Sequence, residues 1–176
     1  MKFLRSARTI AVIAAMLPVA GQAITTCGPT ICYTYDPLQS AAAAFGLPTL
    51  FGDAMRFVPP NFRAESLNGA GTVSVTATWK FDNVYSLGGT EIGKVLVSEA
   101  GDYSITGDSG GVADSVGVNL ETLVFNNASV ELATDFKNFS ATGNTLVPPQ
   151  AWALTSTPIN PATAFASVAT NVAVSI

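Results

Sequence analysis

Strict alternation of apolar and polar residues is the feature of this sequence that most limits its fold. In the run GTVSVTATWKF every second residue from Val73 to Phe81 is apolar, and the residues between them are Ser, Thr or Lys. Successive side chains of a β-strand point to opposite faces of the sheet, so this run predicts a long half-buried strand. The same parity places Trp79 on the apolar face, and we expect it in the core.

Two further runs have the same period. In SVELATDF the apolar face is predicted to carry Val130, Leu132, Thr134 and Phe136, and in the terminal VATNVAVSI it carries Val168, Thr170, Val172, Val174 and Ile176. Shorter strand-like runs, separated by turn sequences such as VPPN, NGAG and LVPPQ, fill most of the remaining chain. This organisation predicts an all-β fold, an antiparallel β-sandwich of immunoglobulin-like or jelly-roll-like architecture.

One short helix is expected near the beginning of this sandwich. Asp36 is a suitable N-cap, Pro37 suits the first turn, LQSAAAAF continues the helix, and Gly46 ends it. No linker separates two halves with cores of their own. We therefore expect a single domain over residues 24–176.

The first 23 residues have the organisation of a secretory signal peptide. Lys2, Arg5 and Arg8 form a basic start, TIAVIAAMLPVA is an apolar centre, and GQA is a small-residue end with cleavage expected after Ala23. The apolar run is short for a membrane span, and no later run is apolar enough to be one. No membrane insertion is therefore expected once the leader is removed. The sequence predicts a secreted protein, placed outside the cell, on its surface or in the periplasm.

Charge excludes two classes of partner. The leader takes three of the eight basic residues, which leaves five against 12 acidic residues. An acidic chain is repelled by nucleic-acid phosphates and by anionic lipid. Neither nucleic acid nor a membrane surface is therefore an expected partner.

The two cysteines stand close together in CGPTIC, directly after the predicted cleavage point. In an oxidising compartment, Cys27 and Cys32 are expected to form a local disulfide across the Gly28-Pro29 turn. The spacing is not that of thiol oxidoreductases, and two cysteines without histidine do not make an ordinary zinc site. We expect the disulfide to be structural.

The run Gly107-Asp108-Ser109-Gly110-Gly111 resembles the nucleophile segment of trypsin-like serine proteases. A serine nucleophile needs a base to accept its proton, and the chain contains no histidine. Valine also follows the run, where that family has proline. We therefore expect a turn between strands at this run, and a protein that is not an enzyme.

A second local motif bears on the fold. In SEAGDYSI, the residues Glu99, Gly101 and Tyr103 are similar to the acidic-x-Gly-x-Tyr corner of immunoglobulin-like sandwiches. The resemblance implies structural roles for Glu99 and Tyr103, with the tyrosine hydroxyl bonded to the backbone. It departs from antibody domains in having Ile105 at the place of the second cysteine.

The segment from Tyr33 to Gly71 resembles the early region of exported Gram-negative proteins of the PEP-CTERM group, which exosortase processes. The family is linked to exopolysaccharide and biofilm matrix, and the resemblance implies location more than mechanism. The Pro-Glu-Pro sorting tail of that group is absent from the sequence: either this member is released without a tail or the sequence is incomplete, and membrane tethering is unsupported in both cases.

Two kinds of ligand remain open. Asp102, Asp108 and Asp114, spaced six apart around a glycine-rich turn, are candidate ligands for calcium, the one cofactor considered, although solvated turn carboxylates are the alternative. Trp152 and Tyr85 are candidate platforms for a glycan, because sandwich modules bind sugars on exposed aromatic rings; buried packing is the alternative.

The sequence thus predicts a secreted, non-enzymatic structural protein of the surface or extracellular matrix, associated with biofilm. Its partners would be itself, other matrix components or polysaccharide. The nearly uncharged terminal strand is a means of self-assembly, since a strand that leaves its own sheet can complete a neighbour's. The alternative is a carbohydrate-binding module or an adhesin-like binding protein.

Overall fold

The computed structural model describes residues 22–66, 71–106, 113–143 and 147–176 and confirms the predicted all-β, sandwich-like fold. Strands β1 to β10 account for most of the regular structure, and the two helices that lie in the described residues are each four residues long. No helix of this described part is long and apolar enough to cross a membrane.

The larger layer is an antiparallel sheet with the order β1-β2-β5-β10-β7-β8. Its strands are β1 (Ile24–Cys27), β2 (Ile31–Tyr35), β5 (Lys80–Ser86), β10 (Asn171–Ser175), β7 (Asp114–Asn126) and β8 (Leu132–Gly143). The terminal strand β10 pairs with β5 on one side and β7 on the other. It therefore lies in the middle of the sheet, with Val172 and Val174 buried.

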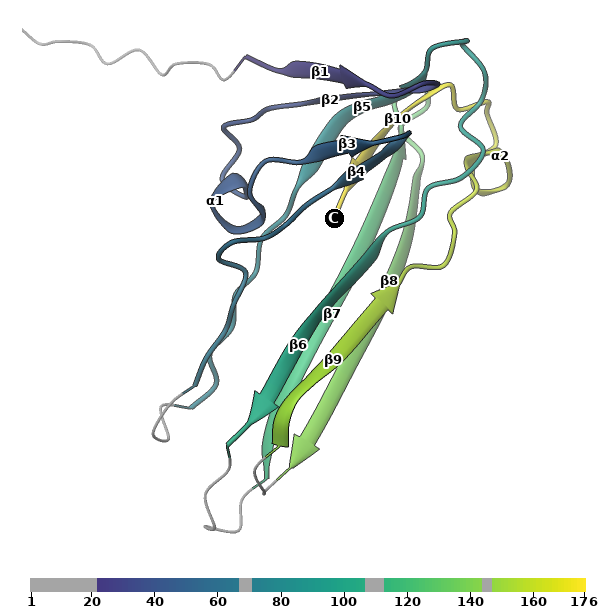
Figure 1. Cartoon of the computed structure of the whole chain (residues 1–176). Helices are drawn as coiled ribbons and strands as arrows, with labels where there is room; N and C mark the ends of the chain where they lie inside the picture. The colour runs from purple at the N-terminus through teal and green to yellow at the C-terminus, as the bar shows by residue number, and fades with distance from the viewer. Residues whose placement is uncertain (1–21, 67–70, 107–112, 144–146) are drawn as a thin grey trace, which may run out of the picture.

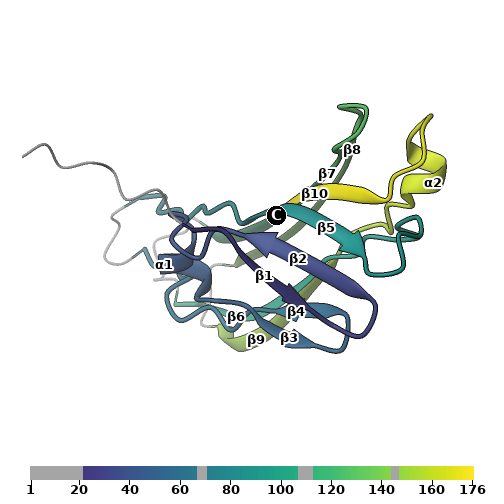
Figure 2. The same cartoon turned by 90° about the horizontal axis from the view of Figure 1, so that it is seen from above.

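Two strand pairs form the facing layer. They are β3 (Thr49–Phe51) with β4 (Ala54–Arg56), and β6 (Ser98–Ile105) with β9 (Val147–Thr155). Figure 1 shows β6 and β9 running along β7 and β8, with β3 and β4 in front of the other half of the sheet, and Figure 2 shows the two layers from above. We call the sheet face under this layer the inner face and the opposite one the outer face.

Aromatic rings fill the space between the layers at the β3–β4 end. Trp79 is fully buried, as the sequence predicts. Its ring centroid lies 4.9 Å from that of Phe57, 5.6 Å from Tyr35 and 6.3 Å from Phe81. Edge-to-face and tilted contacts at these distances are favourable beyond the apolar area that they bury. This cluster joins β2 and β5 to the segment that follows β4.

The helices differ from the prediction of one helix over the run from Asp36 to Gly46. There α1 (Ala42–Phe45) is a single turn, since the Asp36 carboxylate accepts a hydrogen bond from the Leu38 amide and so closes a turn instead of capping a helix. A second turn, α2 (Pro161–Ala164), has Asn160 as its N-cap. The sequence Asn160-Pro161 carries that signal, which we did not predict.

The N-terminal hairpin is fastened by a disulfide and by a carboxylate. Cys27 and Cys32 are bonded, as predicted, and stand opposite each other in the β1–β2 register. The Asp53 carboxylate, in the β3–β4 turn, accepts hydrogen bonds from the Thr30 amide (2.7 Å), the Thr30 hydroxyl (2.6 Å) and the Ile31 amide (3.0 Å). These bonds lower the pKa of Asp53, with the Thr30 hydroxyl first among them. The two turns are therefore held together.

A second carboxylate fastens the opposite edge of the sheet. Glu131 precedes β8 and accepts hydrogen bonds from the Ser129 hydroxyl (2.5 Å), the Ala166 amide (2.8 Å) and the Ser167 hydroxyl (2.9 Å). The bonds from Ser129, Ala166 and Ser167, in that order of effect, lower the pKa of Glu131 to about 2. Glu131 thus ties the β7–β8 turn to the segment between α2 and β10.

Replacing Glu131 with glutamine is expected to flatten the acid dependence of stability. The pKa in the folded state is about 2, against an ordinary 4.5. The ionised carboxylate therefore stabilises the fold fully above about pH 4.5, and this stabilisation is lost as the pH falls through about 2. Urea denaturation over this range should give a shallower fall in the free energy of unfolding for Glu131→Gln, with Ser129→Ala intermediate. Identical profiles for wild type and Glu131→Gln would contradict this role.

Candidate functional site

Among the described residues, part of strand β7 pairs with a neighbouring strand on one side only. The ladder between β10 and β7 runs from Val172 opposite Asn126 to Ser175 opposite Leu123. Strand β7 continues beyond Leu123 to Asp114, and over that length the described residues pair it with β8 alone. We call residues 114–122 of β7 the open edge.

The direction of the backbone amides shows which groups the open edge presents. The Asn126 amide donates to the Glu131 carbonyl on the β8 side, and the Asn127 amide donates to the Asn171 carbonyl on the β10 side. Because amides alternate along a strand, odd-numbered residues of β7 direct their N–H and C=O groups away from β8. Along the open edge these are the groups of Ser115, Gly117, Asn119 and Glu121.

Residues 71–78 lead into β5, and here the sequence-based prediction is corrected. The long strand predicted from Val73 onward begins only at Lys80, and Trp79 exchanges both backbone hydrogen bonds with Ile176. Residues 71–79 carry no strand assignment. Val73 is 45% exposed and Val75 37%, so the predicted apolar face is not buried there. An alternating strand stabilises only where it has a neighbour to pair with.

Two buried polar atoms lie where β10 ends. Among the described residues, Nε1 of Trp79 and Oγ1 of Thr122 are buried side-chain atoms without a hydrogen-bond partner. Trp79 pairs with Ile176, and Thr122 directly precedes Leu123, the residue opposite Ser175. Unsatisfied buried groups are costly and uncommon in folded proteins. The end of the β10 ladder is thus a place where polar groups remain unmatched.

The outer face of β7 and β8 carries apolar side chains. Phe125 lies opposite Leu132, and Glu121 lies opposite Phe136, with Leu123 between them on β7. Phe136 is 58% exposed and Leu132 48%, while Leu123 and Phe125 are half-buried. We call these four residues, Leu123, Phe125, Leu132 and Phe136, the outer apolar patch.

This arrangement reverses the predicted orientation of SVELATDF. Leu132, Thr134 and Phe136 face outward, and the alternate residues face the β6–β9 layer, where the Phe139 ring lies 5.4 Å from Tyr103 and 6.3 Å from Trp152. Strand β8 also begins at Leu132, so Val130 lies before it and is exposed. The interlayer contact that sets the orientation is made by Phe139, which lies after the run SVELATDF.

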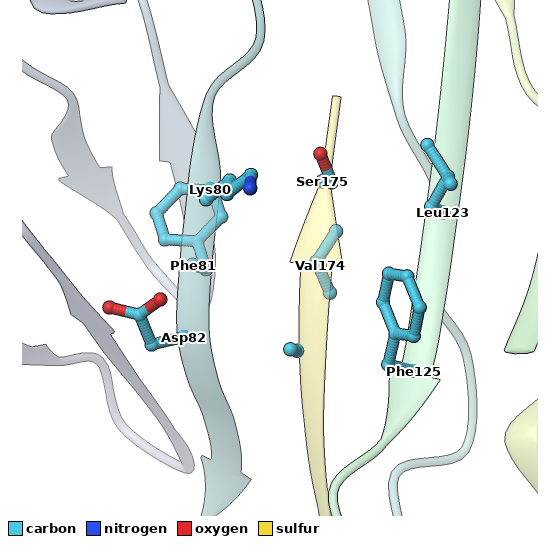
Figure 3. A pocket seen from close by; sticks show the side chains of 8 residues that line it. Lys80, Phe81, Asp82, Leu123, Phe125, Val174 and Ser175 are labelled. Atoms are coloured by element: carbon cyan, nitrogen blue, oxygen red, sulfur yellow. The ribbon is translucent and has the colours of Figure 1, made fainter. Parts of the chain in front are cut away.

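A shallow groove runs over β10 beside the patch. It has a volume of about 320 Å³ and its floor is Ala173, Val174 and Ser175. Figure 3 shows Leu123 and Phe125 of β7 directed toward β10 from one side, with Lys80 of β5 reaching toward β10 from the other. The small residues of β10 leave room between these walls. The groove and the outer apolar patch form one continuous surface across four strands, β5, β10, β7 and β8.

The glycan candidates lie apart in the structure. Tyr85 is on the outer face of β5, opposite Asn171. Nearby, the side-chain amide of Asn127 donates to the side-chain oxygens of Asn83 (3.2 Å) and Asn171 (2.9 Å). Trp152 lies between the layers, stacked on Phe139, and a Cβ on Gly101, the residue opposite it, would come within 2.8 Å of its ring. Of the two, Tyr85 alone has polar side chains beside it on an open face.

The corner predicted from Glu99, Gly101 and Tyr103 is wrong. All three lie inside the continuous strand β6, opposite Leu154, Trp152 and Gln150 of β9. A corner requires these residues to cross between sheets, and here they hold successive inward positions of one strand. Burial between the layers raises the pKa of Glu99. Tyr103 contributes its ring to the contact with Phe139.

The calcium candidates are only partly placed. Asp102 is an exposed residue of β6, Asp114 begins β7, and Asp108 lies outside the described residues, as does Ser109. Within the described ranges, no three Cys, Asp or Glu side chains come close enough to hold a metal ion. The calcium site and the turn role of Ser109 stay predictions.

Comparison of the chain with models of protein families, with curated proteins and with solved structures found no match.

Proposed function

We propose that this protein is an exported, non-enzymatic structural component of the cell surface or extracellular matrix, whose copies assemble by adding strands to one another's sheets. The predicted secretory leader and the resemblance to exported PEP-CTERM proteins support the location. The observation that carries the assembly is the open edge of β7, whose backbone groups have no partner on the β10 side among the described residues. Such edges accept extended segments of other chains.

The donor segment can be chosen by comparing the strand pairing and burial that each candidate would lose on leaving its own molecule. Strand β10, the donor that the sequence favours, is paired on both sides and buries Val172 and Val174. Residues 71–78 are extended, alternate in polarity and expose Val73 and Val75, and they pair with no strand of the described chain. We therefore propose residues 71–78 of one copy as the segment that binds the open edge of the next. A head-to-tail contact of this kind builds fibres when it does not close.

A pair of proline substitutions tests this proposal. Asn119 and Asn138 are exposed and stand opposite each other in the β7–β8 register. By the alternation of amides, the Asn119 N–H faces the open edge, whereas the Asn138 N–H faces the far edge of β8. Proline removes the amide donor, and the local cost to each strand should be similar. Sedimentation of the purified protein over a concentration series should show large assemblies for wild type and Asn138→Pro, and their loss for Asn119→Pro.

Two results would overturn the proposal. A wild-type protein that stays monomeric at every concentration, or an Asn119→Pro variant that assembles as well as wild type, would exclude the open edge as the assembly site. Far-ultraviolet circular dichroism of both variants shows whether the fold is kept. Imaging of the pelleted wild-type material should show filaments.

Glycan binding is the second candidate, favoured by the placement of Tyr85. Its ring shares the outer face with the side-chain amides of Asn83 and Asn171, and amides beside an aromatic ring suit the hydroxyl groups and the apolar face of a sugar. Co-sedimentation with insoluble polysaccharides would then be lost in Tyr85→Ala and kept in Trp152→Ala, since Trp152 lies between the layers. Equal binding by both variants, or none by wild type, would exclude Tyr85 as the platform.

A further inference from the structure

Opposite charges flank the outer apolar patch. Lys80 lies opposite Ser175, which lies opposite Leu123, so Lys80 is two strands, or roughly 10 Å, to one side of Leu123. Glu121 precedes Leu123 by two residues on β7, roughly 7 Å along the strand, and lies opposite Phe136. Both side chains are exposed. The ion pairs formed within the described ranges are Arg63–Glu65 and Lys137–Asp135, so neither charge is used in one.

The placement of the basic residues makes Lys80 distinctive. Two lysines belong to strands of the six-stranded sheet, Lys80 on β5 and Lys137 on β8. Lys137 shares the inward parity of Phe139, donates to the Thr157 hydroxyl (2.8 Å) and pairs with Asp135. Among the described lysines of the sheet, Lys80 is the one on the outer face, and it stands at the rim of an exposed apolar surface that also carries two acids, Asp82 beside Lys80 and Glu121 on β7. A surface with both signs on either side of an apolar centre is complementary to itself.

We propose that this outer face is a two-fold interface between two copies of the chain, in which the outer apolar patches pack face to face. A two-fold axis passing near Leu123 brings Lys80 of each copy to Glu121 of the other. Phe136 and Leu132, left 58% and 48% exposed in one copy, are then covered by the second. Two sheets packed in this way lie about 10 Å apart with interdigitated side chains. The inference rests on the proposed function only in taking copies of this chain as one another's partners.

The occupant follows from the charge pattern. A two-fold contact is isologous, so one acid and one base on the same surface satisfy each other twice. The chain as a whole is acidic, and Lys80 supplies the attraction that allows two such surfaces to meet. Four apolar side chains across neighbouring strands give the apolar centre that protein interfaces have inside a polar rim. A neutral glycan would leave Lys80 and Glu121 without the charged partners that this arrangement provides.

Charge reversal in separate copies tests the two-fold axis. Sedimentation velocity of the Asn119→Pro protein, in which strand addition is blocked, should show a monomer–dimer equilibrium, and adding Lys80→Glu or Glu121→Lys should weaken the dimer about tenfold, because each places like charges together at two contacts. An equimolar mixture of the two variants should restore dimerisation, since every contact then joins one acid and one base. Failure of the mixture to dimerise more tightly than either variant alone would overturn the inference.

Removal of the apolar contact is the second arm of the test. Phe136→Asp should abolish the dimer, and Phe51→Asp, at a residue 78% exposed on β3 in the other layer, should leave it unchanged. A dimer that persists when Phe136→Asp is added would overturn this inference and leave the proposed function standing. If mixing restores the dimer but Asn119→Pro leaves the larger assemblies unchanged, the proposed function is overturned and this inference stands. A wild-type monomer that binds polysaccharide would overturn both.

Discussion

Replacing Trp79 with alanine is expected to reduce the free energy of unfolding by about 3–5 kcal/mol, the largest effect of any single substitution that we predict. Trp79 is fully buried, and its ring meets the rings of Tyr35, Phe45, Phe57 and Phe81. These rings come from β2, from α1, from the segment after β4 and from β5. Loss of the indole removes the contact that joins the β3–β4 layer to the sheet. Since small domains have about 5–15 kcal/mol in total, most of the stability would be lost.

Urea denaturation followed by far-ultraviolet circular dichroism measures this change without using tryptophan fluorescence. Trp79→Phe is the informative second variant. The indole Nε1 has no hydrogen-bond partner within the described chain, so its removal leaves no acceptor unmatched, and the remaining ring fills most of the space. We expect the loss in free energy of unfolding for Trp79→Phe to be well under half of the loss for Trp79→Ala. A loss below about 1 kcal/mol in Trp79→Ala would show that the aromatic cluster is not the central contact of the fold.

The prediction of Trp79 as a core residue succeeded because strand parity is a local property. The prediction that Val73 and Val75 share its burial failed because burial also needs a neighbouring strand, and residues 71–78 pair with no strand of the described chain. Period two identifies which residues share a face. It does not report how far the next strand extends, which is set by pairing between segments almost a hundred residues apart in the chain.

The prediction of which face of β8 is buried failed for a related reason. Counting apolar residues from Val130 to Phe136 favours the face that carries Leu132 and Phe136, yet the β6–β9 layer packs on the face that carries Phe139. Tyr103 and Trp152 reach Phe139 from two other strands, so the decision belongs to the interlayer contact. The amide cluster of Asn83, Asn127 and Asn171 was missed for the same cause, because three separate segments bring it together.

The disulfide and the strand-rich class were predictable because both depend on neighbours in the chain. Cys27 and Cys32 flank a turn, and a two-strand register follows from that turn alone. The contact that secures this hairpin to the other layer was not predictable, since it joins the turn at Gly28 to the turn at Gly52 and Asp53. That contact is the basis of the second large effect.

Replacing Gly28 with alanine is expected to separate the β3–β4 turn from the disulfide hairpin. A Cβ on Gly28 would overlap the Gly52 carbonyl oxygen and lie 2.6 Å from a carboxylate oxygen of Asp53. The first of these atoms belongs to the backbone, so the turn itself must move, and overpacking of this kind costs about 1–3 kcal/mol. The displaced turn also takes the Asp53 carboxylate away from the Thr30 and Ile31 amides. Gly93→Ala is the matched control, since a Cβ there meets nothing within 4 Å.

A double-mutant cycle with Asp53→Ala identifies the cause of the loss. If Gly28→Ala acts by moving the β3–β4 turn, the hydrogen bonds of Asp53 are already broken in that variant, and adding Asp53→Ala should reduce stability little further. Additive losses would mean that the two substitutions act independently and that the turn has not moved. With the disulfide intact in every variant, the cycle separates the fastening of one layer to the other from the closure of the hairpin itself. The expected coupling makes Asp53 the carboxylate that docks the layer and Gly28 the residue that lets it approach.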